Sequence, residues 1–178
     1  SLPEGSVVEP QLDTLEHVAI SKLERAKAHL PNGETHVMVE DSGLFVKPLD
    51  GFPGVYSSHA FKTIGNQGLL RLLNHLKSED PVQSASLRSA SFEAVAALWN
   101  GSRVVIGLGT CPGAIAASES GDEGFGFDPI FVPLDLDEFG QALPPGTYGT
   151  TSTHGATFGS VPQTTKQMFS HRRRALDA

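Results

Sequence analysis

Apolar residues recur at helical spacing in two parts of the chain. The first part follows Asp13, a good N-cap residue with Glu16 three positions later as in a capping box, and it ends at Pro31. The second part runs from Thr63 to Leu76. We therefore expect two helices that each bury one face. The buried positions that the spacing predicts are Leu15, Val18, Ala19, Leu23, Ala26 and Leu30, then Ile64, Leu69, Leu72, Leu73 and Leu76.

Strand-forming residues occur in runs bounded by Gly, Pro, Asn and Asp. Residues 36–39 and 44–49 predict two short strands, with a turn at Ser42-Gly43 between them and a rigid turn over 50–54 after them. Residues 84–99 and 102–109 are longer runs. The Asn100-Gly101 pair between the longer runs predicts an antiparallel hairpin, because both residues tolerate positive φ.

Shorter elements follow in the second half of the chain. Pro112-Gly113 predicts a bend, after which residues 114–117 and 130–132 have the character of short strands. The segment from Leu134 to Ala156 is rich in Gly, Pro and Thr, so we expect a mobile loop without a catalytic role. Ser170 is a plausible N-cap for a helix that continues to Ala178.

Composition limits the classes of protein that this chain can belong to. With 178 residues and 39% hydrophobic content, residues 1–178 predict a single domain. The net charge of −7 argues against non-specific nucleic-acid binding, which needs a dense basic surface. Cys111 is the single cysteine and has no motif, which is typical of a small core residue in a reducing compartment. The sequence shows no membrane-spanning run, so we expect a cytoplasmic protein that binds no membrane.

Two adjacent carboxylates, Glu40 and Asp41, are the first candidates for chemistry. Neighbouring carboxylates repel each other unless a cation lies beside them, and Mg²⁺ bound to carboxylate oxygens is a common solution. The alternative is a solvated turn, in which acidic residues collect for conformational reasons.

Two further stretches contain candidate binding residues. In Gly121 to Pro129, glycines surround Phe125 and Phe127, so that the backbone could approach a flat ligand while Phe125 stacks on it and Asp128 bonds its edge. In Lys166 to Arg172, Lys and Arg flank a predicted helix start, which favours an anion. The alternatives are aromatic rings that only fill a core and a basic surface helix.

The segment EDSGLFVKPLDGFPGVYS, with the two stretches above, resembles the inosine triphosphate pyrophosphatase family, which hydrolyses aberrant purine nucleoside triphosphates. The resemblance implies an α/β fold with an elongated mixed sheet flanked by helices, and two lobes with an active-site cleft between them. It also implies a homodimer. The implied reaction converts ITP, dITP or XTP to the monophosphate and pyrophosphate.

The same resemblance assigns site residues in this sequence. A Mg²⁺ ion would be held by Glu4 and Asp41 with Glu40 nearby, and Asp41 would orient or deprotonate the attacking water. Substrate-binding positions are spread over the whole chain. They are Lys22, Ser42, Phe125, Gly126, Phe127, Asp128, Lys166, His171 and Arg172.

The chain departs from the family pattern at three places. The family's opening strand and Thr-Gly-Asn loop do not precede Ser1, so we expect a longer natural protein. Ser58 replaces a frequent Lys or Arg, and Ser160 stands where relatives have Glu. Two other functions stay open: a pyrophosphatase of the same fold for modified pyrimidine nucleotides, and a non-catalytic module for nucleotide binding or dimerisation.

Overall fold

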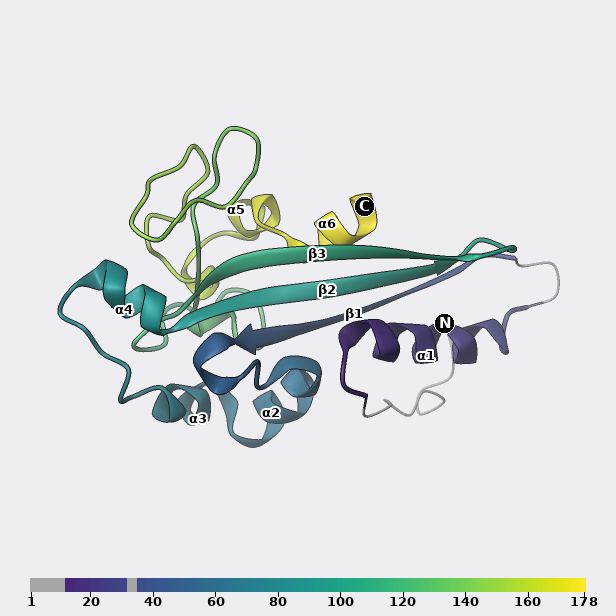
Figure 1. Ribbon diagram of the computed structural model, residues 1–178, viewed down its shortest axis with the longest axis horizontal. Helices are drawn as coiled ribbons and strands as arrows, with labels where there is room; N and C mark the ends of the chain where they lie inside the picture. The colour runs from purple at the N-terminus through teal and green to yellow at the C-terminus, as the bar shows by residue number, and fades with distance from the viewer. Residues whose placement is uncertain (1–11, 32–34) are drawn as a thin grey trace.

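The computed structural model describes residues 12–31 and 35–178, and its centre is a long antiparallel sheet (Figure 1). The strands are β1 (Val37–Val46), β2 (Ser89–Trp99), β3 (Val104–Ile115) and β4 (Phe131–Pro133), in the spatial order β1-β2-β3-β4. All three pairings are antiparallel. The α/β class is as predicted, but within the described ranges no parallel pairing makes the sheet mixed.

The β2–β3 hairpin confirms the strongest local prediction. Asn100 to Arg103 connect the strands, and the Asn100 side-chain oxygen accepts hydrogen bonds from the backbone N–H of Ser102 at 3.1 Å and of Arg103 at 3.0 Å. Gly101 has a φ of 91°, which explains the need for glycine. The predicted bend at Pro112-Gly113 is wrong, because β3 pairs with β2 straight through these residues.

β1 is one continuous strand, so the predicted turn at Ser42-Gly43 is wrong. Its register with β2 is unbroken from Val37, opposite Trp99, to Val46, opposite Ala90. Gly43 is needed for close packing instead, since a Cβ at this position would lie 2.3 Å from the carbonyl oxygen of Gly54. Beyond Val46 the chain forms a 3-10 turn, η1 (Lys47–Leu49), rather than more strand.

The helices differ from the predictions mainly at their ends. α1 (Leu15–Lys27) is capped by Thr14, not by Asp13: its hydroxyl accepts a hydrogen bond from the backbone N–H of His17. The helix predicted over 63–76 is the shorter α3 (Gly65–Leu72), and a further helix that was not predicted, α2 (Ser57–Thr63), precedes it. Residues 84–87, predicted as strand, belong to α4 (Pro81–Leu87), where the Asp80 carboxylate caps the backbone N–H of Val82 at 2.9 Å.

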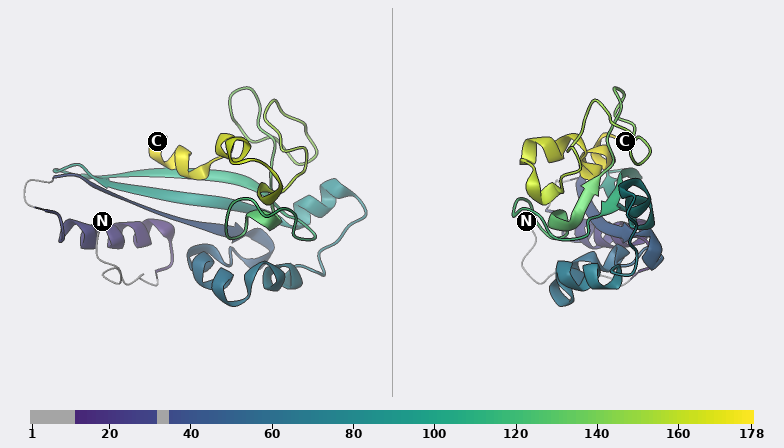
Figure 2. Two further views of the ribbon diagram at one scale, coloured as in Figure 1. Left: turned by 180° about the vertical axis from the view of Figure 1, so that it is seen from behind. Right: turned by 90° about the vertical axis from the view of Figure 1, so that its left-hand side faces the viewer.

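At the C-terminal end, α5 (Gln163–Met168) precedes α6 (His171–Asp177). Ser170 caps α6 as predicted, by accepting a hydrogen bond from the backbone N–H of Arg173. α1, α2 and α3 lie on one side of the sheet, and α5 and α6 lie on the other (Figures 1 and 2). α6 approaches β3 closely because residue 109 is glycine; a Cβ there would lie 1.8 Å from the carbonyl oxygen of His171.

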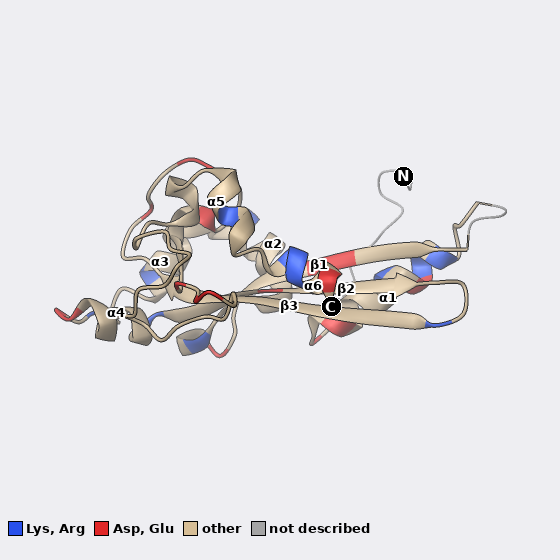
Figure 3. Ribbon diagram, turned by 90° about the horizontal axis from the view of Figure 1, so that it is seen from above, with Lys and Arg blue, Asp and Glu red and all other residues tan. Residues whose placement is uncertain are grey.

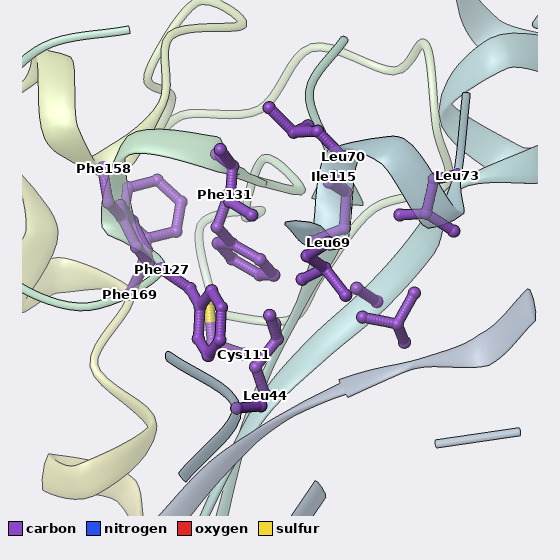
Figure 4. Close-up of a cluster of buried hydrophobic side chains, with 14 of the residues drawn as sticks. Leu44, Leu69, Leu70, Leu73, Cys111, Ile115, Phe127, Phe131, Phe158 and Phe169 are labelled. Carbon is purple, nitrogen blue, oxygen red and sulfur yellow. The ribbon is translucent and has the colours of Figure 1, made fainter. Parts of the chain in front are cut away.

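Three apolar clusters of the described residues hold these layers together; in the smallest, Ala175 of α6 packs against Ala94 and Ala96 of β2. α1 packs Leu15, Ala19 and Leu23 against one face of the long strands. The largest cluster fills the wide end of the molecule and includes Cys111, which is buried as predicted (Figure 4). Burial raises the pKa of its thiol to about 12. Among the described residues, no helix is long and apolar enough to cross a membrane.

The 134–156 segment is not an unstructured loop. Leu136 is buried and forms bridges with Ala142 and Thr151. The Asp135 carboxylate accepts hydrogen bonds from the backbone N–H of Gly149 at 3.0 Å and from the Ser152 hydroxyl at 2.8 Å. These contacts fold the segment onto its own start, away from the cavity described below.

Candidate active site

A cavity of about 410 Å³ opens at the β1 edge of the sheet, between α2 on one side and α5 and α6 on the other. The 124–129 loop, which contains the two predicted aromatic residues, forms a further wall. Eight of the predicted substrate-binding residues line this cavity although they are far apart in sequence. They are Ser42, Phe125, Gly126, Phe127, Asp128, Lys166, His171 and Arg172.

The Phe125 ring is the exposed aromatic surface of the cavity. It is 63% exposed, with Lys166 Nζ 4.7 Å and Arg172 Cζ 5.2 Å from the ring centroid. An exposed ring beside two cations suits a ligand that is planar at one end and anionic at the other. Phe127, by contrast, is 4% exposed and packs edge-to-face on Phe61, with ring centroids 5.5 Å apart.

Asp128 fixes the loop from inside. Its buried carboxylate accepts a hydrogen bond from the Phe125 backbone N–H at 2.8 Å and forms an ion pair with Lys166. Both contacts use Oδ2, so the Asp128 side chain holds the loop, and its expected contact with the edge of a ligand stays a prediction. Lys166 links this carboxylate to the exposed Phe125 ring.

Arg172, at the start of α6, reaches β1 across the cavity wall. Its Nη2 donates a hydrogen bond to Ser42 Oγ at 2.9 Å, and its Nε lies 3.2 Å from Glu40 Oε1. Figure 3 shows this basic end of α6 beside the acidic part of β1. The packing of α6 on the sheet thus brings together two residues that are 130 positions apart in the sequence.

Glu40 and Asp41 lie on opposite faces of β1, because successive side chains of a strand alternate. Asp41 is directed to the α1 side, where its carboxylate pairs with Lys22. Glu40 is directed to the α6 side, where it meets Arg172. The two carboxylates therefore do not share one side of β1, and the assignment of both as metal ligands stays a prediction; Glu4 lies outside the described residues. Within residues 12–31 and 35–178, no group of three or more His, Cys, Asp or Glu converges as a metal site.

His171 is buried beneath the cavity and stacks on Phe92, with centroids 5.2 Å apart and an interplanar angle of 10°. Burial, and then the positive charges of Arg172, Lys166 and Arg174, lower the pKa of its imidazole to about 3. The ring is therefore neutral at physiological pH, with one nitrogen as donor and one as acceptor.

This pKa predicts a loss of stability in acid. In the unfolded chain His171 binds a proton near pH 6.5, whereas in the folded protein it stays neutral down to a pH of about 3. The free energy of unfolding therefore falls as the pH drops from 6.5 to about 3. Between pH 7 and pH 5 the expected contribution is roughly 2 kcal/mol. Urea unfolding at both pH values measures it, and the difference should shrink by that amount in His171→Gln. An identical pH dependence in both proteins would contradict the buried neutral state.

The sequence did not single out several residues that line the cavity. Phe61 and Lys62 belong to α2, which was not predicted, and Phe92 had been interpreted only as a packing residue. Asn66 on α3 donates a hydrogen bond to the Gly126 carbonyl at 3.3 Å and so supports the 124–129 loop from outside. A helical period that included residues 57–63 could have indicated Phe61, but nothing local indicates the contact of Asn66.

The open sheet, the exposed Phe125 ring and the convergent Lys and Arg side chains define a class: an α/β protein with a site for an anionic ligand that carries a planar group. The sequence profile of the Ham1 family matches residues 2–178. The chain therefore belongs to the Ham1 family.

Relatives and solved structures agree with this membership. The chain is 37% identical over 173 residues to the dITP/XTP pyrophosphatase of Ignicoccus hospitalis, covering 97% of this chain and 77% of the relative. It is 39% identical over 171 residues to the dITP/XTP pyrophosphatase of Thermococcus kodakarensis, covering 96% and 76%. The structure of the Staphylococcus aureus Ham1 protein matches with a TM-score of 0.69 and 30% identity, covering 98% of this chain and 78% of that one.

Proposed function

We propose that this protein hydrolyses ITP, dITP and XTP to the nucleoside monophosphate and pyrophosphate, and so removes aberrant purines from the nucleotide pool. The observation that carries the proposal is the exposed Phe125 ring with Lys166 and Arg172 beside it, in a family whose relatives include dITP/XTP pyrophosphatases. A purine base would stack on the ring while the cations attract the polyphosphate.

The geometry of β1 suggests how the substrate is placed. In the described part of the chain β1 is the edge strand, with Ser42 directed to the cavity and Asp41 to the opposite face. We propose that the base occupies the cavity and that the polyphosphate crosses the edge of β1 towards Asp41 and Lys22. Lys22 would then be a substrate contact, and its ammonium would attract the phosphates.

Asp41 is the proposed catalytic residue. Its carboxylate would orient the attacking water and take up its proton, with the Lys22 ammonium beside it. Enzymes of this family work with a divalent metal ion. We propose Mg²⁺, held by the oxygens of Asp41 together with Glu4, since carboxylate oxygens are the ligands that this hard cation prefers. When bound, the ion would neutralise phosphate charge.

Selection of the base would depend on the 124–129 loop and on His171. Inosine and xanthosine carry a 6-oxo group where adenine carries an amine. A hydrogen-bond donor directed at that position therefore pairs with the 6-oxo group and leaves adenine unpaired. Backbone N–H groups of the loop and the neutral His171 ring are the proposed donors. A pocket that leaves a buried polar group unpaired with the wrong base discriminates strongly.

Pyrophosphate release over a panel of triphosphates tests the proposal. We expect turnover of ITP, dITP and XTP with Mg²⁺, much slower turnover of ATP and GTP, and none in excess chelator. Preference for a modified pyrimidine triphosphate would favour the sister enzyme of the same fold. Binding without any hydrolysis would favour the non-catalytic module. Sedimentation of the same sample tests the proposed homodimer; fractionation of cells that express the protein tests the proposed cytoplasmic location.

Phe125→Ala is expected to raise KM for ITP by roughly 5- to 150-fold, because loss of base stacking costs about 1–3 kcal/mol. The value of kcat should change little, since the reacting phosphates lie elsewhere. Phe139→Ala is the matched control, because Phe139 is 79% exposed on the 134–156 segment. A KM for ITP that is unchanged in Phe125→Ala would remove the ring from the binding site.

A further inference from the structure

The guanidinium of Arg172 is held by contacts with three residues from two segments, β1 and the 124–129 loop. Nη2 bonds Ser42 Oγ at 2.9 Å, Nε lies 3.2 Å from Glu40 Oε1, and the Phe125 ring centroid is 5.2 Å from Cζ. Among the described residues, Nη1 has no partner. The contacts thus fix the plane of the guanidinium and leave one nitrogen for a ligand.

Glu40 supplies the charged contact in this arrangement. Its Oε1 is buried and has no hydrogen bond within the described residues, although it is 3.2 Å from Arg172 Nε. The contact is therefore an ion pair with imperfect hydrogen-bond geometry. A buried carboxylate oxygen is costly without a cation, so Glu40 and Arg172 each constrain the other.

An anchor matters for Arg172 because its long side chain is partly exposed to solvent. Its side chain is 44% exposed, and a long side chain of this type loses up to about 2 kcal/mol of conformational entropy when it is ordered. If the ordering occurs before the ligand arrives, the cost does not reduce the affinity for the ligand. Glu40 lies on the rigid, paired strand β1, opposite Ala96 of β2, which makes it a suitable anchor.

We infer that Glu40 is a positioning residue that orients Arg172 for the substrate, and that it is not a ligand of the catalytic metal. The inference rests on the proposed function for its kinetic readout only. Its structural basis is that Glu40 and Asp41 face opposite sides of β1. Glu40 thus lies on the side of β1 where Ser42 and Arg172 line the cavity, and Asp41 lies on the side of the proposed reaction centre.

The kinetic test uses Glu40→Ala and the isosteric Glu40→Gln. We expect Glu40→Ala to raise KM for ITP about five- to tenfold, the effect of losing about 1–1.4 kcal/mol from a half-exposed charged contact, with kcat within a factor of about two. Glu40→Gln keeps an oxygen acceptor and should recover part of the loss. Glu93→Gln, a carboxylate on the neighbouring strand that bonds Ser91, is the control.

Two measurements separate positioning from metal binding. In the Arg172→Ala background, Glu40→Ala should have no further effect on KM, because the side chain that it positions is gone. The Mg²⁺ concentration for half-maximal rate should be the same in Glu40→Gln and the unaltered protein. Additive effects with Arg172→Ala, or a several-fold rise in that Mg²⁺ concentration, would overturn the inference.

A readout without turnover keeps the test independent of the proposed function. In ¹⁵N-labelled protein, the Arg172 Nε–H signal, assigned by its loss in Arg172→Ala, should exchange slowly with water. Glu40→Ala should shift that signal and speed its exchange, whereas Glu93→Gln should leave it unchanged. An unaltered signal in Glu40→Ala would overturn the positioning role, even if the protein hydrolysed no triphosphate at all.

Discussion

Asp41→Asn is expected to lower kcat for ITP by about 10²–10⁴-fold, the usual contribution of a positioned general base. The substitution keeps the shape of the side chain but removes the charge that orients the water and, in the proposal, holds the metal. KM should change less than kcat, because the base pocket on the other face of β1 stays intact. Initial rates of pyrophosphate release at saturating Mg²⁺ measure the effect.

The fold should survive this substitution. Asp41 and Lys22 are both largely buried, and a buried ion pair that loses one partner completely can cost several kcal/mol. The Asn amide oxygen can still accept a hydrogen bond from Lys22, so we expect a smaller loss and an unchanged circular dichroism spectrum. Glu93→Gln again serves as the control. A kcat for Asp41→Asn within a factor of three of the unaltered protein would refute the proposed mechanism.

Arg88→Met is expected to cause the largest loss of stability. Arg88 is 4% exposed, and its guanidinium donates hydrogen bonds to the carbonyls of Ile115 at 2.8 Å, Leu73 at 2.7 Å and Ala116 at 2.7 Å. Burial lowers the pKa of the guanidinium, and within the described residues no carboxylate pairs with it. Arg88 thereby joins the end of α3 to the end of β3.

Methionine fills a similar volume but removes the Arg88 donor from all three carbonyls; the Leu73 carbonyl keeps the backbone N–H of Leu76 at 3.0 Å, whereas those of Ile115 and Ala116 lose the side-chain donor. Each unsatisfied group costs about 1–3 kcal/mol, so we expect a loss of about 3 kcal/mol or more in the free energy of unfolding. That is a large part of the 5–15 kcal/mol that is usual for a domain. Urea unfolding measures the loss. Arg103 is exposed, so Arg103→Met should change the free energy of unfolding by no more than about 0.5 kcal/mol. An equally small change in Arg88→Met would show that water replaces the hydrogen bonds of Arg88.

Local signals were enough to predict several elements. Asn100-Gly101 predicted the β2–β3 hairpin because the turn depends on the conformational freedom of its own residues. The capping serine of α6 and the apolar face of α1 were predicted for the same reason: each involves residues within a turn or two of one another. The α/β class, and the sequence stretches that line the cavity, could also be recognised in the sequence.

Other features depended on contacts between distant segments. Gly43 looked like a turn residue, yet it lies inside β1 because Gly54 packs against its backbone and β2 pairs along its whole length. Asp128 was predicted only as a ligand contact, and the structure adds a second role: its Oδ2 pairs with Lys166 and accepts the Phe125 backbone N–H. No local pattern contains these partners, which lie from three to about fifty residues away.

The pair Glu40-Asp41 shows most clearly what the sequence determines and what the tertiary structure determines. The sequence by itself determined that two carboxylates stand side by side, and that they belong to a stretch shared with a family of pyrophosphatases. Only the tertiary structure decided that the chain is extended here, so that strand geometry directs one carboxylate to Lys22 and the other to Arg172. A turn would have brought both to one ion; pairing with β2 separates them across the sheet.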